Sequence, residues 1–388
     1  MLAAMALATA VVTLLLNLFS MGVVVWRLRK PLGEPRLGSI GAPPISLVRP
    51  VRGVDAFAEE TLRSSFRQRY PHFEVLLCCA DAADPVVPLL RRLITEHPSI
   101  PARVLIGRDD ITPNPKLNNM VKGFAAARHP YVVFADSNLL LPADYLSRLC
   151  AAWGPETGLV SAPPVGSRPE GFAAELECAF LNAYQARWQL WAAESGIGFA
   201  QGKTLMWRIA DLEAAGGIAM LGLEIAEDAA STKIVQAHGK EVSLAERPFE
   251  QPLGRRTLLQ TWDRQVRWAR LRRVTFPLHF VPEIFSSSLL PLVLGCLGAA
   301  ALGFSPSGFA AVFLGLWFGL EAVLVRVAGW HLTWRTPFAW MVRDLLIPAV
   351  WVSAWLGNSF TWHGTTIAIP QRSADTGLVD SDASLRGR

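Results

Sequence analysis

The chain begins with an uncharged apolar stretch that runs from about Leu2 to Val25. About 20 apolar residues at 1.5 Å each cross the hydrocarbon core of a bilayer, so this stretch is long enough to span one as a helix. No basic segment precedes it and no small-residue cleavage site follows it, which favours a permanent anchor over a cleaved signal peptide. Residues 1–30 are therefore predicted to form an N-terminal transmembrane anchor.

The next long apolar stretches all lie after residue 276. They are Ile284–Phe304, Phe309–Val325 and Leu345–Trp362. Glu321 interrupts the second stretch, and a carboxylate at membrane depth either serves function or pairs with a nearby cation, here Arg326 or Arg343. Residues 277–370 are predicted to hold about three transmembrane helices, and the polar residues 371–388 a disordered tail.

Basic residues set the predicted orientation. Arg27, Arg29 and Lys30 follow the first stretch, and arginines recur between the last two stretches. Because basic residues beside membrane helices favour the cytosolic side, the N-terminus is expected outside and residues 31–276 in the cytosol. Only 18% of the residues are charged, against about 25% in soluble domains, which favours a chain that lies partly in lipid. The Ala- and Arg-rich composition without retention signals favours a bacterial inner membrane.

The block from residue 31 to residue 276 alternates short apolar runs with amphipathic segments. Expected strands are Ile45–Val48, Phe73–Ala80, Arg103–Ile106 and Tyr131–Ala135, and expected helices are Glu59–Arg69, Val86–His97 and Leu117–Ala127. Strands that are apolar almost throughout, alternating with helices, predict an α/β domain with a parallel sheet covered on both faces. Asp81 and Asp136 stand directly after expected strands, at the sheet edge where such folds bind ligands.

Four polar signatures follow one another along this block. They are Asp81, Asp136-Ser137-Asn138, Glu227-Asp228, and the RQVRW segment Arg264–Trp268. No GxGxxG, GxxxxGK[ST], HExxH or CxxC motif occurs, which disfavours a dinucleotide site, a P-loop and a zinc protease. The order of the four signatures resembles the D, D-x-S/D, D, (Q/R)xxRW pattern of GT-A-fold, family-2-like glycosyltransferases.

Longer segments narrow the resemblance to one branch. LVRPVRGVD, NPKLNN, ADSN, GFAQGKTLMWR and AEDAASTK look like segments of the ceramide glucosyltransferases, glycosyltransferase family 21. The resemblance implies a GT-A fold, a Rossmann-like mixed sheet with helices on both faces, in a cytosolic catalytic domain over residues 31–254. Residues 255–276 hold seven arginines among apolar residues and are expected to form a basic amphipathic helix on the membrane surface.

The resemblance also implies roles for individual residues. Asp228 is the expected general base of an inverting displacement, with Arg264, Arg267 and Trp268 as the other catalytic residues. Expected donor-site residues are Pro50, Asp55, Asp81, Lys116, Asn118, Asp136 and Arg264, and expected acceptor-site residues are Gly202, Glu227 and Trp268. Asp136 is also the expected ligand of a divalent metal, Mg²⁺ or Mn²⁺, although D-S-N lacks the second carboxylate of D-x-D.

The implied reaction is transfer of glucose from UDP-glucose to the primary hydroxyl of a two-tailed membrane lipid, with ceramide as the first candidate. Diacylglycerol and hopanoid lipids stay open as acceptors, and polysaccharide synthesis is a more distant alternative because such enzymes usually have more membrane spans. A catalytically inactive scaffold is disfavoured because all four signature positions are filled. The net charge of +5 suits anionic lipid and a phosphate-bearing donor, and no nucleic-acid partner is expected.

Overall fold

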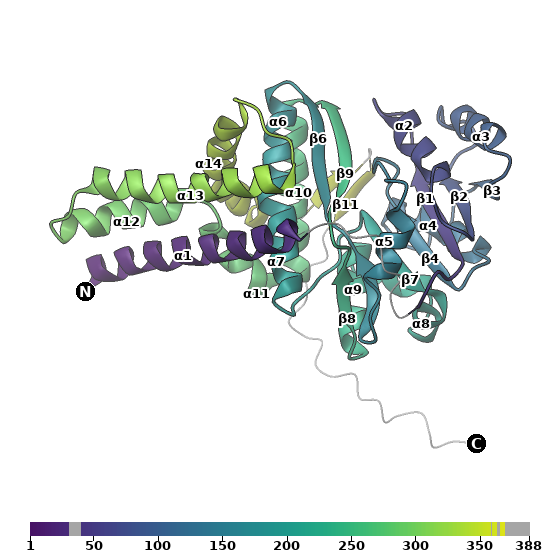
Figure 1. Cartoon of the computed structure of the whole chain (residues 1–388), viewed down its shortest axis with the longest axis horizontal. Coiled ribbons are helices and arrows are strands. Elements are labelled where there is room, and N and C mark those ends of the chain that lie inside the picture. Colours follow the sequence, from purple (N-terminus) through teal and green to yellow (C-terminus); the bar gives the residue numbers. More distant parts are fainter. Residues whose placement is uncertain (31–39, 358, 363–364, 369–388) are drawn as a thin grey trace, which may run out of the picture.

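The structure is a computed structural model of the chain, and it describes residues 1–30, 40–357, 359–362 and 365–368. Figure 1 shows an α/β domain from which a group of apolar helices projects to one side. The predicted tail, residues 371–388, lies outside the described residues.

The α/β domain is built on a seven-stranded sheet in the order β3-β2-β1-β4-β7-β5-β8. Its strands are β1 (Ile45–Val51), β2 (Phe73–Cys79), β3 (Ala102–Ile106), β4 (Tyr131–Ala135), β5 (Thr157–Ser161), β7 (Thr204–Arg208) and β8 (Glu241–Leu244). Strands β1 to β4 run parallel, whereas β7 runs antiparallel to both of its neighbours, β4 and β5. The sheet is therefore mixed, as the family resemblance implied, and not purely parallel as the strand pattern alone suggested.

Helices cover both faces of this sheet. They are α2 (Ala58–Arg63), α3 (Val87–Glu96) and α5 (Tyr145–Ala151) on one face, and α4 (Pro115–Ala126), α8 (Ile209–Ala214) and α9 (Glu227–Ala237) on the other. Ile45 and Leu47 of β1 pack into the first of these two cores, and Val48 packs into the second. Burial on both sides explains why the strands are apolar at nearly every position.

The predicted helix Glu59–Arg69 is only partly α-helical in the structure. It is α-helical only over α2 and then tightens into a 3₁₀ turn, η1 (Ser64–Phe66). Ser64 Oγ accepts the Leu141 N–H at 3.0 Å, and Gln68 Nε2 donates to the Pro142 carbonyl at 3.0 Å. These bonds to a loop distant in the sequence take the place of a further helical turn. Helical periodicity cannot reveal such bonds.

A second layer joins the sheet to the apolar helices. It consists of the parallel strands β6 (Pro164–Glu170) and β9 (Phe249–Arg255), of α6 (Phe172–Ala179), the π-helical η2 (Phe180–Ala186) and α7 (Arg187–Glu194) in direct succession, and of α10 (Leu258–Thr275). Thr257 and Gln260 form a capping box at the start of α10, and this helix packs against α6. The short elements η3 (Ile218–Gly222), α11 (Pro277–Phe280) and η4 (Val281–Phe285) complete the connections.

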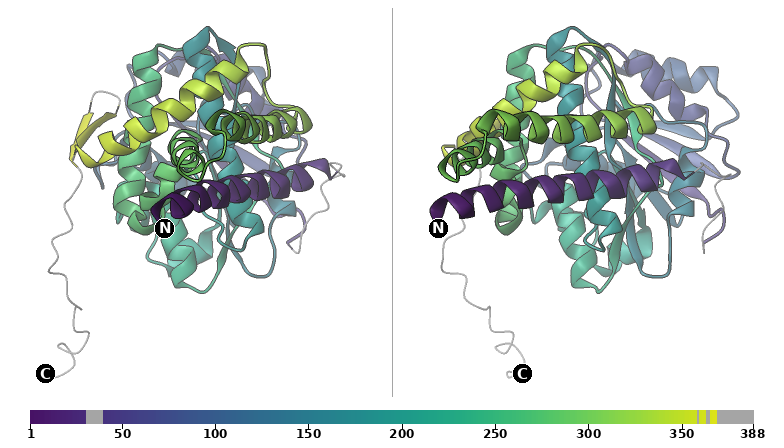
Figure 2. Two further views of the ribbon diagram at one scale, coloured as in Figure 1. Left: turned by 90° about the vertical axis from the view of Figure 1, so that its left-hand side faces the viewer. Right: turned by 60° about the vertical axis from the view of Figure 1, so that its left-hand side comes forward.

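Three described helices are long and apolar enough to cross a membrane, namely α1 (Leu2–Arg29), α13 (Pro306–Ala328) and α14 (Thr336–Trp355). A fourth span results if Pro277–Phe285 and α12 (Leu289–Ala301), which are bent by 52° relative to each other, are counted as one. Helix α1 packs against α12 and α13, and Figure 2 shows α1 and α13 side by side. The apolar helices from the two ends of the chain therefore form one group.

Two predicted apolar stretches have other bounds in the structure. Ile284–Phe304 is broken before α12, where the Ser288 N–H donates to Asp344 Oδ2 of α14 at 2.9 Å. Helix α14 starts well before the predicted Leu345, and the chain after it forms strands β10 (Ser359–Trp362) and β11 (Thr365–Ala368).

A buried ion-pair cluster lies in the part of α14 that precedes the predicted start. Arg343 donates to Glu321 of α13 at 2.5 and 3.0 Å and to Asp344 at 2.7 and 2.8 Å. Because Arg343 and Asp344 pair with each other and Arg343 also pairs with Glu321, α14 can include both of these charged residues. Of the two cations expected beside Glu321, Arg343 is thus a direct partner.

Candidate active site

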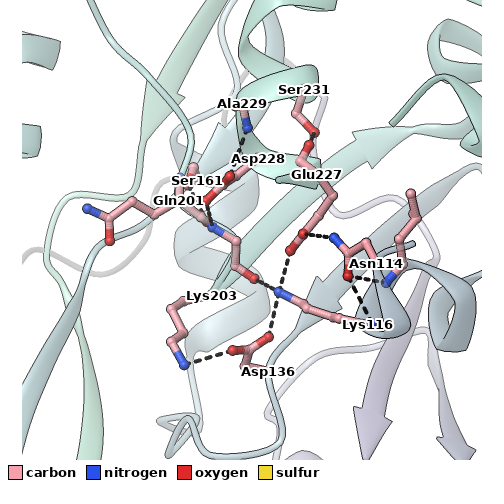
Figure 3. A network of polar contacts seen from close by, with 12 residues as sticks. Asn114, Lys116, Asp136, Ser161, Gln201, Lys203, Glu227, Asp228, Ala229 and Ser231 are labelled. Carbon is pink, nitrogen blue, oxygen red and sulfur yellow. Dashed lines mark hydrogen bonds and ion pairs between the residues drawn. The ribbon is translucent and has the colours of Figure 1, made fainter. Parts of the chain in front are cut away.

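Four of the polar residues predicted from the sequence meet beyond the carboxyl end of β4, namely Lys116, Asp136, Glu227 and Asp228 (Figure 3). Asp136 follows β4, and its backbone N–H donates to the Lys203 carbonyl at 3.1 Å, just before β7. Glu227 and Asp228 begin α9, and Lys116 lies in the first turn of α4. Segments far apart in the sequence therefore supply one network.

Lys116 is the centre of this network. Its Nζ lies 2.6 Å from Asp136 Oδ1 and 2.7 Å from Glu227 Oε1, and it donates to the carbonyl oxygen of Gly202. Burial lowers the pKa of Lys116, but the charges of Asp136 and Glu227 outweigh burial and raise this pKa above its ordinary value. Lys116 is therefore a permanent cation.

Lys203 binds the other side of the same carboxylate. Its Nζ lies 2.7 Å from Asp136 Oδ2 and 3.1 Å from Asn138 Oδ1. Burial would raise the pKa of Asp136, but the ammonium groups of Lys116 and Lys203 lower it well below its ordinary value. Two cations thus share the Asp136 carboxylate, and because Glu227 also pairs with Lys116, the charges of the two lysines and the two carboxylates balance.

Asp228 lies in a different electrostatic environment. Its Oδ2 accepts the Gly202 N–H and its Oδ1 accepts its neighbour Ala229's N–H, both at 2.8 Å. Burial and the nearby charge of Glu227 raise the pKa of Asp228 to about 6. A carboxylate with a raised pKa and a fixed orientation can take a proton near neutral pH, as a general base requires.

The local sequence NPK explains how α4 presents Lys116. Asn114 caps the helix because its Oδ1 accepts the N–H groups of Lys116 at 2.9 Å and Leu117 at 3.1 Å, and Pro115 takes the first helical position. The same amide donates through Nδ2 to Glu227 Oε2 at 2.8 Å. One residue therefore fixes both the start of α4 and its contact with α9.

Gly202 connects the base to the lysine network. Its N–H binds Asp228 and its carbonyl binds Lys116. A Cβ added here would lie 2.6 Å from Glu227 Oε1, 3.0 Å from Lys116 Nζ and 3.4 Å from Asp228 Oδ2. The close approach of three polar side chains to this backbone requires glycine.

A fully buried arginine supports the loop after β4. Arg49 donates through Nη2 to the carbonyl oxygens of Asp136, Ser137 and Leu139 at 2.9, 3.1 and 3.0 Å. Its Nη1 donates to Ser65 Oγ at 2.8 Å. Burial lowers the pKa of Arg49 to about 10, so the guanidinium keeps its charge and holds this loop in place.

The donor-site residues predicted near β1 and β2 lie outside the lysine network. Asp55 and Asp81 are exposed, and each accepts a backbone N–H in its own turn, from Phe57 at 3.3 Å and from Ala83 at 2.9 Å. Pro50 is buried within β1. Because β1 and β2 are parallel neighbours, the two exposed carboxylates follow adjacent strand ends, where a nucleotide can reach them.

Asn118 supports a loop through its side chain. Its Oδ1 accepts the Thr112 N–H at 3.0 Å and its Nδ2 donates to the Thr112 carbonyl at 2.8 Å. The neighbouring Asn119 instead binds the carbonyls of Val51 at 3.2 Å and Cys78 at 2.7 Å, at the ends of β1 and β2. The NPKLNN segment thus braces the strand ends as well as presenting Lys116.

The RxxRW segment lies on α10, against α6. Arg264 Nη1 donates to Glu177 Oε1 of α6, and Arg256 Nε lies 3.3 Å from Glu177 Oε2. Trp268 packs against a buried cluster that includes Cys178. Helix α6 therefore fixes the motif side chains of α10.

Electrostatic contact links α10 to the lysine network. Burial lowers the pKa of Lys203, and the positive charge of Arg264 lowers it further. Burial also lowers the pKa of Arg267 to about 10, with Arg264 again contributing. The charge of Arg264 therefore influences both Lys203 and Arg267.

Other arginines of α10 bind protein groups. Arg272 pairs with Glu283 at 2.7 and 2.9 Å, and Arg270 and Arg273 donate to carbonyl oxygens after α14. These arginines therefore join α10 to the C-terminal part of the chain. The interfacial position of α10 stays a prediction.

The predicted role of Asp136 as a metal ligand implies a divalent metal at this site. Among the described residues, no group of three or more His, Cys, Asp and Glu side chains could hold one. Both Asp136 oxygens are paired with lysines, and Asn138 stands where D-x-D has its second carboxylate. Mg²⁺ is commonly held by one or two carboxylates plus substrate phosphates. Asp136 therefore fits a metal that is bound mainly by a diphosphate, and not one bound by the protein alone.

Four residues of this region were not singled out from the sequence. They are Arg49, Asn114, Glu177 and Lys203. Lys203 follows Gly202 in GFAQGK, and Asn114 precedes a proline, so both stood inside recognised segments. Glu177 carried the clearest independent signal, because it is one of two acids, with Glu175, in the otherwise apolar α6.

Comparison with solved structures defines the class of protein. The chain resembles a mannosyltransferase from Pyrobaculum calidifontis solved in complex with GDP-Man and Mn²⁺, with a TM-score of 0.54 and 16% identity, over 92% of this chain and 98% of that one. At this identity the likeness shows the fold alone. Together with the helices long enough to span a membrane, it defines a protein of GT-A fold that carries candidate membrane helices.

Sequence comparison identifies the family. The family model described as Glycosyl transferase family 21 matches residues 5–374. The chain therefore belongs to that family. Ceramide glucosyltransferase 1 of Caenorhabditis elegans is 26% identical over 328 residues, 83% of this chain and 70% of that protein. Ceramide glucosyltransferase of Komagataella phaffii is 36% identical over 108 residues, 27% of this chain and 21% of that protein. The predicted family, fold and class of enzyme, a hexosyltransferase, are confirmed.

Proposed function

We propose that this glycosyltransferase transfers glucose from UDP-glucose to the primary hydroxyl of ceramide, with inversion at the anomeric carbon. The observation that carries the proposal is the arrangement around Gly202. One backbone unit orients a proton-accepting carboxylate, Asp228, beside a cluster of cations that suits a diphosphate. The relatives named as ceramide glucosyltransferases support ceramide as the acceptor.

Asp228 acts as the general base. Its carboxylate takes the proton of the acceptor hydroxyl while the hydroxyl oxygen attacks the anomeric carbon from the face opposite the diphosphate. The bond between that carbon and the phosphate oxygen breaks, and UDP leaves with the bonding electrons. The N–H groups of Gly202 and Ala229 hold the carboxylate during this step.

Lys116, Lys203 and Arg264 stabilise the negative charge that develops on the leaving diphosphate. The two lysines now share Asp136, and each can turn an N–H toward a phosphate oxygen without leaving the site. A bound Mg²⁺ or Mn²⁺, with Asp136 as its protein ligand, would add charge neutralisation at the same diphosphate. Asp55 and Asp81 are the proposed contacts of the nucleoside.

The proposed enzyme works at the cytosolic face of a bacterial inner membrane. Residues 1–30 anchor it with the N-terminus outside, residues 31–254 form the catalytic domain, and residues 277–370 return to the membrane. Helix α10, within residues 255–276, then lies between catalytic site and bilayer, with Leu258 and Leu259 exposed at its start. This position allows a lipid hydroxyl to reach Asp228 from the membrane side.

Mass spectrometry of lipid products tests the proposed function. Purified protein receives UDP-glucose with ceramide and diacylglycerol in competition, and the Asp228→Asn variant serves as control. We expect glucosylceramide from the wild type and none above background from the variant. Glucosyl-diacylglycerol as the main product would show that the acceptor is a glycerolipid and not ceramide. Consumption of UDP-glucose without a lipid product would refute transfer to a lipid.

A further inference from the structure

Glu177 is a buried carboxylate to which the mechanism above gives no role. It lies on α6 between the apolar residues Leu176 and Cys178, and its side chain is 0% exposed. Its Oε1 accepts from Arg264, and its Oε2 lies 3.3 Å from Arg256 Nε. Because well-packed apolar residues are often at least as stable as a buried ion pair, stability alone does not account for this carboxylate.

The position of Arg264 needs an offsetting negative charge. Arg256 lies 3.3 Å from the same Glu177 carboxylate that binds Arg264, so two guanidinium groups converge on this point. The guanidinium of Arg264 also lies 5.8 Å from the centre of the Trp268 ring, and Trp268 packs on the buried cluster around Cys178. Side chains of α6 therefore hold both Arg264 and Trp268, with Glu177 providing the charge.

We propose that Glu177 is a positioning residue of the transfer reaction, which binds Arg264 and fixes its guanidinium between α6 and Trp268, so that this cation and the lysines around Asp136 act on one leaving diphosphate. A diphosphate carries charge on both phosphates, and two cations in a fixed arrangement stabilise it better than one cation with a mobile neighbour. The proposal rests on the proposed function only in requiring a nucleoside diphosphate donor. It does not depend on which lipid accepts the sugar.

The same helix offers a matched control. Glu175 is also buried, but it binds His331 and Thr333, which precede α14, and Thr336, the first residue of α14. Glu175→Gln removes a buried charge of the same kind from α6 without touching α10. Any effect of Glu177→Gln that Glu175→Gln reproduces is therefore structural.

Glu177→Gln should separate turnover from nucleotide affinity. We expect kcat to fall about tenfold, because Arg264 is no longer held in place. The Kd for UDP, measured by calorimetry, should stay unchanged or decrease, because the site loses a negative charge. Glu175→Gln should keep both values near wild type even where the melting temperature falls. A parallel loss of kcat and UDP affinity in Glu177→Gln, or wild-type kcat, would overturn the proposal.

A double substitution tests whether the effect passes through Arg264. Arg264→Gln should lower kcat, and adding Glu177→Gln should lower it by less than twofold more, because the group to be positioned is already gone. The neutral pair also keeps the proposal testable should Glu177→Gln alone fail to fold. A further tenfold loss in the double variant would refute a role through Arg264. UDP binding needs no lipid, so a wild type that binds UDP but glucosylates no lipid would refute the acceptor assignment alone.

Discussion

Two clusters of buried charge in this protein have similar chemistry and different surroundings. In the sheet domain, Lys116 bridges two carboxylates, and the side chains of Lys116 and Asp136 remain 13% and 20% exposed. In the apolar helices, Arg343 bridges Glu321 and Asp344, and none of these three side chains is more than 3% exposed. The first cluster can therefore meet a substrate, whereas the second is closed by its own partners.

The comparison shows that access, and not the presence of buried charge, separates a reactive cluster from a structural one. Breaking a closed ion pair leaves an uncompensated charge and costs about 3–5 kcal/mol in typical proteins. The lysines of the open cluster have an alternative, since a diphosphate can replace Asp136 as their partner. We therefore expect substitutions in the two clusters to affect different measurements.

The largest effect on turnover is expected from Asp228→Asn. An amide cannot take the acceptor proton, so kcat should fall about 10²- to 10⁴-fold while UDP affinity stays near wild type. Steady-state kinetics and UDP calorimetry measure the two quantities. Asp211→Asn, which changes a surface aspartate paired with Arg208, is the control. Lost UDP affinity with residual turnover would assign the base elsewhere.

Metal removal should have the next largest effect. Metal ions stabilise transition-state charge by several kcal/mol, so a chelator should lower turnover about 10²-fold and Mg²⁺ or Mn²⁺ should restore it. The measurement is initial rate against free metal concentration. A rate indifferent to the chelator would contradict the metal role of Asp136 and assign charge neutralisation to Lys116 and Lys203.

Gly202→Ala should disturb the open cluster without removing any charge. The new Cβ would lie 2.6 Å from Glu227 Oε1 and 3.0 Å from Lys116 Nζ, so these side chains must move. Displacement of reacting groups by about 1 Å can cost up to 10²-fold, and we expect a fall in kcat of roughly 10- to 10²-fold. Gly154→Ala, at a glycine outside the site where an added Cβ would meet only Thr157 Oγ1 at 3.7 Å, is the matched control for loss of a glycine. Wild-type kcat in Gly202→Ala would show that the cluster is looser than its contacts indicate.

The pH dependence should report the environment of Asp228. Burial and Glu227 raise the pKa of this carboxyl to about 6, and only its deprotonated form accepts a proton. The value of kcat/KM should therefore be constant above about pH 6 and fall roughly tenfold per pH unit below it. A profile that stays flat down to pH 5 would contradict the assignment.

The smallest effect on turnover is expected in the closed cluster. Glu321→Gln leaves Arg343 with one carboxylate partner fewer, so the melting temperature in detergent should fall. The kcat per folded molecule should stay within about twofold of wild type, because this pair has no contact with the site. A well-folded variant with strongly reduced kcat would instead give Glu321 the functional role that intramembrane carboxylates often have.

Much of the α/β domain was predictable because its signals are local. Apolar runs bounded by polar residues identified β1 to β4, and the residues after those strands included Asp136. The order of the four signatures then indicated the family. The antiparallel direction of β7 was not predictable from strand composition, because pairing direction depends on how the chain returns to the sheet.

The active-site residues divide in the same way. Asp136, Asp228 and Lys116 were recognised from their segments, and the structure brings them together. Asn118 was recognised for the same reason, yet its side chain braces its own loop. A motif identifies a segment, but it does not say which side chain of the segment faces the site.

By itself, the sequence determined the long apolar N-terminal helix, the α/β domain and the family, because hydrophobic periodicity and motif order are properties of neighbouring residues. Only the tertiary structure decided which charges are partners, as for Lys203 with Asp136, Arg343 with Glu321 and Glu177 with Arg264. The physical reason is that an ion pair depends on distance and burial. Both are set by the packing of segments far apart in the chain, and no local pattern records them.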